Sequence, residues 1–293
     1  MDMGGNLQSQ AKKIAIETRL PSQPLQPYID FYYFIKNDST DFKSIHYSFP
    51  HLVNVVSIYQ HAKFESAFGT ARISSDPDND FLSLLQGKCQ HPLRVELIGK
   101  TNRISIWFKN LRLNHFIRTP LGTIMGNTTN QLCEWDSDPI YQACLQQCFA
   151  TDNIEHKVAL LEEFLIAKLL PISFSYLEKA ANMLMDIDKD YSINDILKEI
   201  DIPTRTFNRH FKEALGVAPI EFQRIARFRH SVNNKLFDKE FKKLTAIGYD
   251  SHFYDQSDFI KMYKKLTGSN PKAFFNTVNR LANDKLILQF VKE

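Results

Sequence analysis

The chain has 293 residues, of which 43% are hydrophobic and 12% aromatic. This length allows two domains, and this composition excludes a chain that is disordered throughout. The net charge of +3 is unevenly spread, because residues 205–280 hold 15 Lys and Arg against 7 Asp and Glu, or +8. The rest of the chain holds 21 Lys and Arg against 26 Asp and Glu, a net charge of −5. A basic segment joined to an acidic remainder indicates that the basic segment binds a polyanion.

Membrane and secretory signals are absent from the sequence. It contains no run of 18 apolar residues, and its first twenty residues lack the apolar core of a signal peptide. We therefore expect a cytoplasmic protein that does not contact a membrane. The four cysteines show no spacing typical of a disulfide scaffold or a zinc site, so we expect no cofactor or metal. They are Cys89, Cys133, Cys144 and Cys148.

Residues 20–135 have the pattern of short strands. Apolar and mostly polar residues alternate over 29–35 and 104–108, and turn-forming clusters separate the apolar stretches 52–59, 63–68, 81–85 and 95–98. Regular short strands favour a small antiparallel barrel or sandwich, which could hold a small ligand or serve as a plain scaffold. Aromatic residues at Tyr32, Tyr33 and Trp107 make a ligand pocket one hypothesis for this domain.

Helical spacing replaces this pattern after Asp136. Apolar residues recur at helical intervals from Ile154 to Leu169, and Pro171 then ends the run. An amphipathic helix of this kind either packs inside its own domain or supplies a dimer face, and the pattern leaves both open. We place a domain boundary near Pro171, since only helical patterns follow from Ser173 onward.

An internal repeat with a spacing of 52 residues is the strongest signal in the chain. In each copy, aromatic residues four apart bury one side of a helix, glycine ends that helix, and proline opens the next. Two basic positions keep the same offset. The matched pairs are Phe207 and Phe259, Phe211 and Tyr263, Gly216 and Gly268, Pro219 and Pro271, Phe222 and Phe274, Arg209 and Lys261, and Lys212 and Lys264.

A shorter helix and a tight turn precede each copy. In the first copy Ser192 should cap a helix over 193–200, and a turn over 201–204 should lead into the second helix. In the second copy a helix over 244–250 leads to a turn at His252, and Asp255 should cap the following helix. A helix, a short turn and a second helix with a basic outer face form the helix-turn-helix arrangement.

A helical wheel selects the residues that would face DNA. With Phe207 and Phe259 directed into the core, polar and basic residues of both second helices fall on the opposite side. Arg209 could instead clamp a phosphate group or pair with Glu199. The candidate DNA-binding residues are Arg205, Thr206, Asn208, Arg209, Lys212, Gln256, Ser257, Lys261, Lys264 and Lys265.

Residues 173–275 resemble the AraC/XylS family of bacterial transcription regulators, whose DNA-binding domain holds two helix-turn-helix units joined by a long helix. The resemblance rests on residues 193–211, on Gly216 to Pro219, on the arginine-rich 224–228 and on the second-unit signature at 253–259. Departures from the family pattern are His252 for a turn glycine, Asp258 for a histidine, Gly248 for an alanine and Asp201 for a small residue. The three departures in the second unit, His252, Asp258 and Gly248, would make that unit less rigid or less specific.

The N-terminal part resembles, more loosely, the β-rich sensor-like domain of one branch of this family. The match lies in an opening with Pro21, Leu25, Pro27, Tyr28 and Ile29. The resemblance implies effector sensing or dimerisation, but it carries over no particular ligand.

These observations predict an α+β protein with two domains: a β-rich barrel or sandwich followed by helices, then an all-α domain of two helix-turn-helix units joined by a linker helix. We expect a flexible tail over 1–19, a sensor or dimerisation domain over 20–170, a DNA-binding domain over 171–280 and a C-terminal tail over 281–293. The predicted function is sequence-specific transcription regulation, with two recognition helices in successive major grooves of double-stranded DNA. Further candidate partners are a small-molecule effector, RNA polymerase and a second copy of the chain.

Other functions receive less support. The alternative within the same class is a regulator that acts through protein contacts, with DNA binding weakened by the unusual second turn. An enzyme is not expected, because the scattered histidines of the β-rich part show no metal-ligand spacing. RNA binding is disfavoured because the basic segment lacks glycine-aromatic strand motifs.

Overall fold

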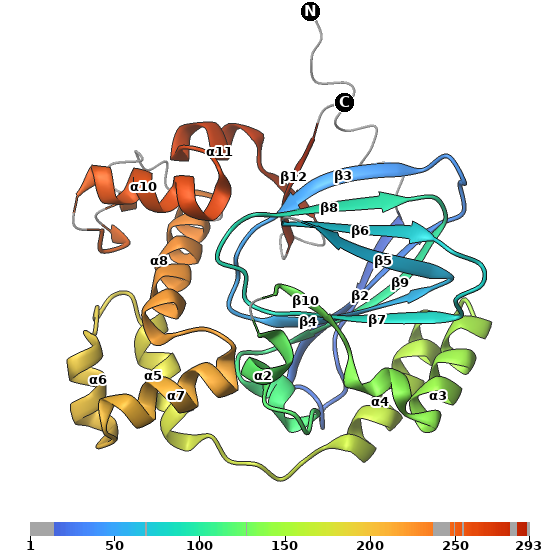
Figure 1. The fold of residues 1–293 in the computed structure, drawn as a ribbon, viewed down its shortest axis with the longest axis horizontal. Coiled ribbons are helices and arrows are strands. Elements are labelled where there is room, and N and C mark those ends of the chain that lie inside the picture. The colour runs from blue at the N-terminus through green and yellow to red at the C-terminus, as the bar shows by residue number, and fades with distance from the viewer. Residues whose placement is uncertain are drawn as a thin grey trace, which may run out of the picture.

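The computed structural model describes residues 15–67, 69–126, 128–236, 247–248, 250–253, 255–281 and 286–291. Two β-sheets of six strands each face one another, and the helices of the C-terminal part lie beside them (Figure 1). The predicted α+β organisation, with a β-rich N-terminal part and a helical C-terminal part, is confirmed.

The first sheet is antiparallel throughout and has the strand order β1-β2-β9-β4-β7-β10. Its strands are β1 (Ala15–Arg19), β2 (Ile29–Asn37), β9 (Thr101–Phe108), β4 (Asn54–Gln60), β7 (Phe81–Gln86) and β10 (Asn130–Leu132).

The second sheet has the order β11-β12-β3-β8-β6-β5, and its β6–β8 pair is parallel. Its strands are β11 (Asn279–Leu281), β12 (Leu286–Phe290), β3 (Lys43–Ser48), β8 (Leu93–Ile98), β6 (Thr70–Ser75) and β5 (Ala62–Ala67).

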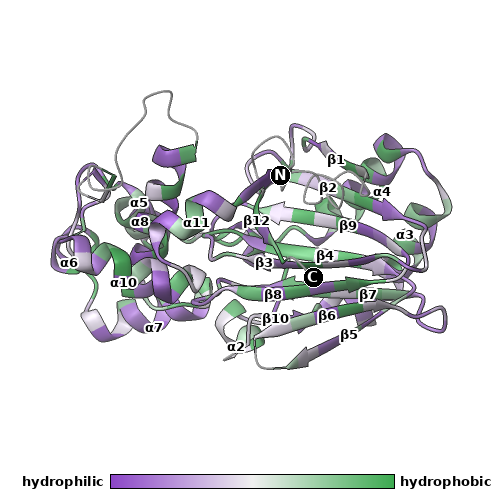
Figure 2. Ribbon diagram, turned by 90° about the horizontal axis from the view of Figure 1, so that it is seen from above, coloured by the Kyte–Doolittle hydropathy of each residue, from purple (hydrophilic) through white to green (hydrophobic). Residues whose placement is uncertain are grey.

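The first sheet is covered on both faces, and the alternation along β9 shows how. Ile104, Ile106 and Phe108 join the core beneath α3 (Pro139–Ala150) and α4 (Ile154–Lys168). Arg103 and Trp107 point the other way, into the space between the sheets. Figure 2 shows β4 and β7 mostly in the hydrophobic colour, as strands buried on both sides require. Both helices thus pack inside their own domain, α3 through residues such as Leu145 and α4 through residues such as Leu161.

Short elements connect the sheets to the helices. They are η1 (Arg112–His115), α2 (Leu121–Met125) and η2 (Glu134–Ser137). The C-terminal helices are α5 (Ser175–Met185), α6 (Ile193–Ile200), α7 (Thr204–Leu215), α8 (Pro219–Leu236), α10 (Gln256–Thr267) and α11 (Pro271–Thr277).

The C-terminal helices contribute to two cores, one towards each end of the long helix α8 (Figure 1). The first core contains Phe207, Phe211 and Phe222, and the second contains Phe259 and Phe274. Residues of the β-rich part complete the second core, since the Phe49 ring packs edge-on against Phe274 with centroids 4.9 Å apart. The β-rich part and the second helical unit therefore share buried apolar surface.

The expected C-terminal tail over 281–293 is wrong for the residues that the structure describes. Strand β12 pairs antiparallel with β3, in register from Leu288 with Ser48 to Phe290 with His46. Ile287 and Phe290 are buried, so this short apolar run gains hydrophobic burial by joining the sheet. The end of the chain thus returns to the N-terminal half.

Candidate functional site

The first helix-turn-helix unit begins and ends as its sequence predicts. Ser192 and Asp195 form a reciprocal capping box at the start of α6. Asp201 adopts a left-handed backbone with φ 50° in the turn, and Gly216 ends α7 at φ 76°. Asp and Gly tolerate this region better than most residues, so the turn can be tight without a large cost.

The second unit also has a left-handed turn residue, a side-chain helix cap and a glycine at the end of its second helix. His252 takes the turn conformation at φ 54°, the Asp255 carboxylate accepts a hydrogen bond from the Asp258 backbone N–H, and Gly268 ends α10 at φ 74°. Most of the helix predicted over 244–250 lies outside the described residues. Gly248, which is described, packs with its backbone against the Phe259 ring.

Buried aromatic rings determine which sides of α7 and α10 remain exposed. Phe207 and Phe211 are fully buried and contact one another at 5.4 Å between ring centroids. Phe259 and Tyr263 make the equivalent pair at 4.8 Å. Because each pair holds one side of its helix in a core, the opposite side faces outward in both units.

Most of the candidate DNA-binding residues lie on these outward sides. Exposed side chains on α7 are Arg205, Asn208, Arg209 and Lys212, with Thr206 partly exposed. Exposed side chains on α10 are Gln256, Ser257, Lys261 and Lys264.

Two of the candidate side chains have partners within the protein. Lys265 lies with its Nζ 3.3 Å from the Glu221 carboxylate on α8, so its charge is partly compensated there. Arg209 lies 3.7 Å from Glu213, one turn along α7. The alternative pairing of Arg209 with Glu199 is wrong, since Glu199 instead pairs with Lys179 at 2.6 Å.

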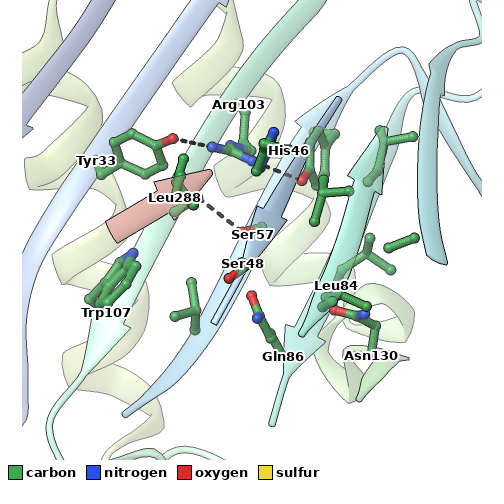
Figure 3. Close-up of a pocket in the computed structure, with 17 residues that line it drawn as sticks. Tyr33, His46, Ser48, Ser57, Leu84, Gln86, Arg103, Trp107, Asn130 and Leu288 are labelled. Carbon is green, nitrogen blue, oxygen red and sulfur yellow. Dashed lines mark hydrogen bonds between the residues drawn. The ribbon is translucent and has the colours of Figure 1, made fainter. Parts of the chain in front are cut away.

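A small cavity of about 80 Å³ lies between the two sheets (Figure 3). Apolar side chains from both sheets line it, together with Tyr33 and Trp107 of the predicted aromatic set. Tyr32 points away from the cavity, and its hydroxyl lies 3.2 Å from the Glu162 carboxylate on α4. The alternation of β2 therefore assigns these two neighbouring tyrosines to opposite faces of the sheet.

A buried arginine is the main polar feature of the cavity, and sequence reasoning did not single it out. Arg103 donates hydrogen bonds to the Tyr59 hydroxyl, at 3.2 Å, and to the Tyr33 hydroxyl. Within the described ranges its Nε has no hydrogen-bond partner, and neither have Nδ1 of His46 and Nε1 of Trp107, all of them buried. A guanidinium keeps its proton in proteins, so a positive charge is buried here. Among the described residues, no carboxylate forms an ion pair with Arg103.

The environment of Arg103 also determines the state of His46. Burial, and then the nearby Arg103 charge, lower the pKa of His46 to about 3. Its imidazole is therefore neutral near pH 7, with one ring nitrogen able to donate and one able to accept. One sequence signal could have identified Arg103: it is an arginine at an inward position of a strand that is otherwise buried.

Other site types find little support in the part of the chain that the structure describes. No group of three or more His, Cys, Asp or Glu side chains is arranged there to hold a metal ion. The cysteines that it covers are all free, and Cys144 and Cys148 share one helix face with their sulfurs 3.9 Å apart. No helix among these residues is both long and apolar enough to cross a membrane.

The two units together have the arrangement of a helix-turn-helix domain. Residues 196–277 match the family model described as a helix-turn-helix domain. These residues of the chain thus form a helix-turn-helix domain.

Similar solved structures include ToxT from Vibrio cholerae O395, with 17% identity, a TM-score of 0.38, and coverage of 90% of this chain and 98% of that one. Another is the unsaturated fatty acid-bound ToxT of V. cholerae strain SCE256, with 15% identity, a TM-score of 0.42 and coverage of 89% and 94%. No curated protein matches the chain.

Proposed function

We propose that this protein regulates transcription by binding DNA sequence-specifically, with α7 and α10 in successive major grooves. The observation that carries the proposal is the matched exposure of two helices, each presenting polar and basic side chains opposite a buried aromatic pair. The N-terminal half of such a helix is where base edges are reached. Arg205, Thr206 and Asn208 lie there on α7, as do Gln256 and Ser257 on α10.

Selection of bound sites from random double-stranded DNA tests this function. The chain should bind its selected site at least about 10³-fold more tightly than a scrambled site at the same salt concentration, as specific DNA-binding proteins do. Equal affinity for both sequences would favour the alternative in which the protein acts through protein contacts. RNA polymerase and a second copy of the chain are the further partners that the family resemblance implies.

We further propose that the cavity between the sheets binds a small organic anion as effector. A buried charge without a counter-ion costs several kcal/mol, and an anionic ligand beside the free Nε of Arg103 would offset that cost. The indole N–H of Trp107 offers a second donor, and Val55, Leu84 and Leu93 offer apolar contact.

The proposed effector site makes a prediction about ligand-induced stabilisation. A panel of short-chain carboxylates and hydroxycarboxylates is screened by thermal unfolding. A ligand present at about 100 times its Kd should stabilise the wild-type protein by ~2.7 kcal/mol, which corresponds to a rise of several degrees in Tm. Arg103→Met should abolish this rise, because the charge that binds the anion is removed.

Tyr32→Phe is the matched control for the Arg103 variant. Tyr32 belongs to the same sheet, but its hydroxyl contacts the helix side and not the cavity, so the rise in Tm should persist. No rise with any carboxylate, or an equal rise in Arg103→Met, would contradict the proposed anion site. DNA binding by the wild-type protein would then still stand, since it depends on other residues.

A further inference from the structure

One loop of the β-rich part contacts the C-terminal ends of both candidate recognition helices. The loop comprises residues 87–92 and joins β7 to β8, at the edge of the sheets that faces the helices (Figure 1). Its Lys88 Nζ donates a hydrogen bond to the Leu215 carbonyl at the end of α7, at 3.2 Å. Its His91 Nδ1 lies 3.3 Å from the Lys265 carbonyl near the end of α10. Two residues three apart in sequence thus reach two different helix-turn-helix units.

The end of α7 is enclosed by further contacts from the β-rich part. The Asn114 side-chain amide donates to the Ala214 carbonyl at 2.9 Å. Helix α2 packs so closely that a Cβ at Gly122 would lie 2.5 Å from the Lys212 carbonyl oxygen. The last carbonyls of a helix lack partners within the helix, and they carry its partial negative charge. Lys88 and Asn114 supply donors for two of these carbonyls.

Burying the Lys88 side chain at this contact costs free energy. Its side chain is buried, it also donates to the Asn54 side chain at 2.9 Å, and burial lowers the pKa of its ammonium group to about 7. An apolar residue of similar size often serves stability equally well at a buried charged position. A role in positioning α7 gives a reason for a hydrogen-bonding side chain that can reach the helix end.

The contact with α10 is more exposed and involves the same loop. A Cβ at Gly268, the C-cap of α10, would lie 3.9 Å from the Pro92 ring, next to the His91 contact. The Lys265 side chain of the same helix pairs with Glu221 on α8. The end of α10 therefore lies between the linker helix and the loop.

We propose that Lys88 and His91 are positioning residues that fix the spacing of α7 and α10, and with it the spacing of the two DNA blocks that the protein accepts. This inference rests on the proposed function, in which both helices contact DNA. The loop is also continuous with the cavity walls, since Gln86 on β7 and Leu93 on β8 line the cavity. The backbone thus joins the cavity walls directly to the two residues that contact the helix ends.

The test is a comparison of operators with different spacing. The selected site and a version with two base pairs inserted between its blocks are titrated with full-length protein at one salt concentration. Wild-type protein should prefer the unaltered site by at least about tenfold, because the insertion turns one block around the helix axis. The double variant Lys88→Met, His91→Ala should lose most of this preference. Its affinities for the two sites should differ by no more than about threefold, because each helix can then bind its own block independently.

Lys100→Met is the matched control, since this exposed lysine lies in the turn at the other end of β8. It should keep the wild-type ratio. The single variant His91→Ala removes an exposed side chain without disturbing a core, and it should lower the ratio even if the double variant folds poorly. A ratio unchanged in folded His91→Ala and in the folded double variant would overturn the positioning role. A wild-type protein that shows no preference for its selected site over scrambled DNA would instead refute the proposed function.

Discussion

Phe211→Ala should destabilise the first helix-turn-helix unit by about 3–5 kcal/mol, which is the usual cost of removing a buried phenylalanine ring. The Phe211 ring is fully buried between Phe207 and Phe222, with both ring centroids 5.4 Å away. Deleting it leaves a cavity where three helices meet, so α7 loses the contact that directs its outer side. Urea denaturation followed by far-UV circular dichroism measures this change.

Ile220→Ala provides the control in the same unit. Ile220 is 53% exposed at the start of α8, so its replacement should change the free energy of unfolding little. DNA affinity should fall in Phe211→Ala and persist in Ile220→Ala. A Phe211 variant with wild-type stability would show that this ring does not anchor the unit.

Arg205→Ala and Asn208→Ala should each weaken binding to the selected site by about 1–3 kcal/mol, or roughly 5- to 150-fold. Both side chains are exposed in the N-terminal half of α7, where they can reach base edges. Arginine can make paired hydrogen bonds with guanine, and asparagine with adenine. Binding to scrambled DNA should change less, since phosphate contacts dominate there. Titrations against both sequences measure the difference.

Folding of these two variants is checked by circular dichroism. Lys100→Ala, which removes an exposed positive charge from the β-rich part, should keep the wild-type preference. If folded Arg205→Ala and Asn208→Ala proteins also keep it, α7 does not read the bases. The assignment of the first recognition helix would then be wrong.

The helical part was largely predictable because its signals are local. The aromatic residues four apart, the capping Ser192 and Asp255 and the glycines at 216 and 268 act within one or two helical turns. Each of these signals occurs in both copies of the repeat, so a chance occurrence does not explain it. The left-handed backbone at Asp201 and His252 fits their places in the family pattern, where they replace a small turn residue and a turn glycine.

The contacts between the two parts could not be read from the sequence. Lys88 and Leu215 are 127 residues apart, and no periodicity relates a loop lysine to the carbonyl of a distant helix. Strand β12 was missed for a related reason, because a short apolar run forms a strand only if a partner edge is available. The sequence analysis did not identify Arg103, although its strand otherwise has the pattern of a buried one. The role of Arg103 depends on the facing sheet, which the local sequence does not show.

The ion-pair partners of lysine and arginine side chains on the surface could not be predicted from the sequence either. Lys265 shares the helix face of the other candidate residues on a wheel, yet its side chain turns to Glu221 on α8. A wheel gives the direction in which a side chain leaves the helix, whereas a long flexible side chain ends where its nearest counter-charge lies. Under the proposed function, we therefore expect Gln256, Ser257, Lys261 and Lys264 to be the side chains of α10 that face DNA.

Footprinting on the selected site tests most directly the central claim that two recognition helices read DNA together. Hydroxyl-radical cleavage and methylation interference on both strands give the protected positions. The proposed binding mode predicts two blocks, with centres about 10–10.5 bp apart on one face of the duplex, as for helices in successive major grooves. A single short block, unchanged when the sequence one helical turn away is scrambled, would contradict it and leave one unit without contact to DNA.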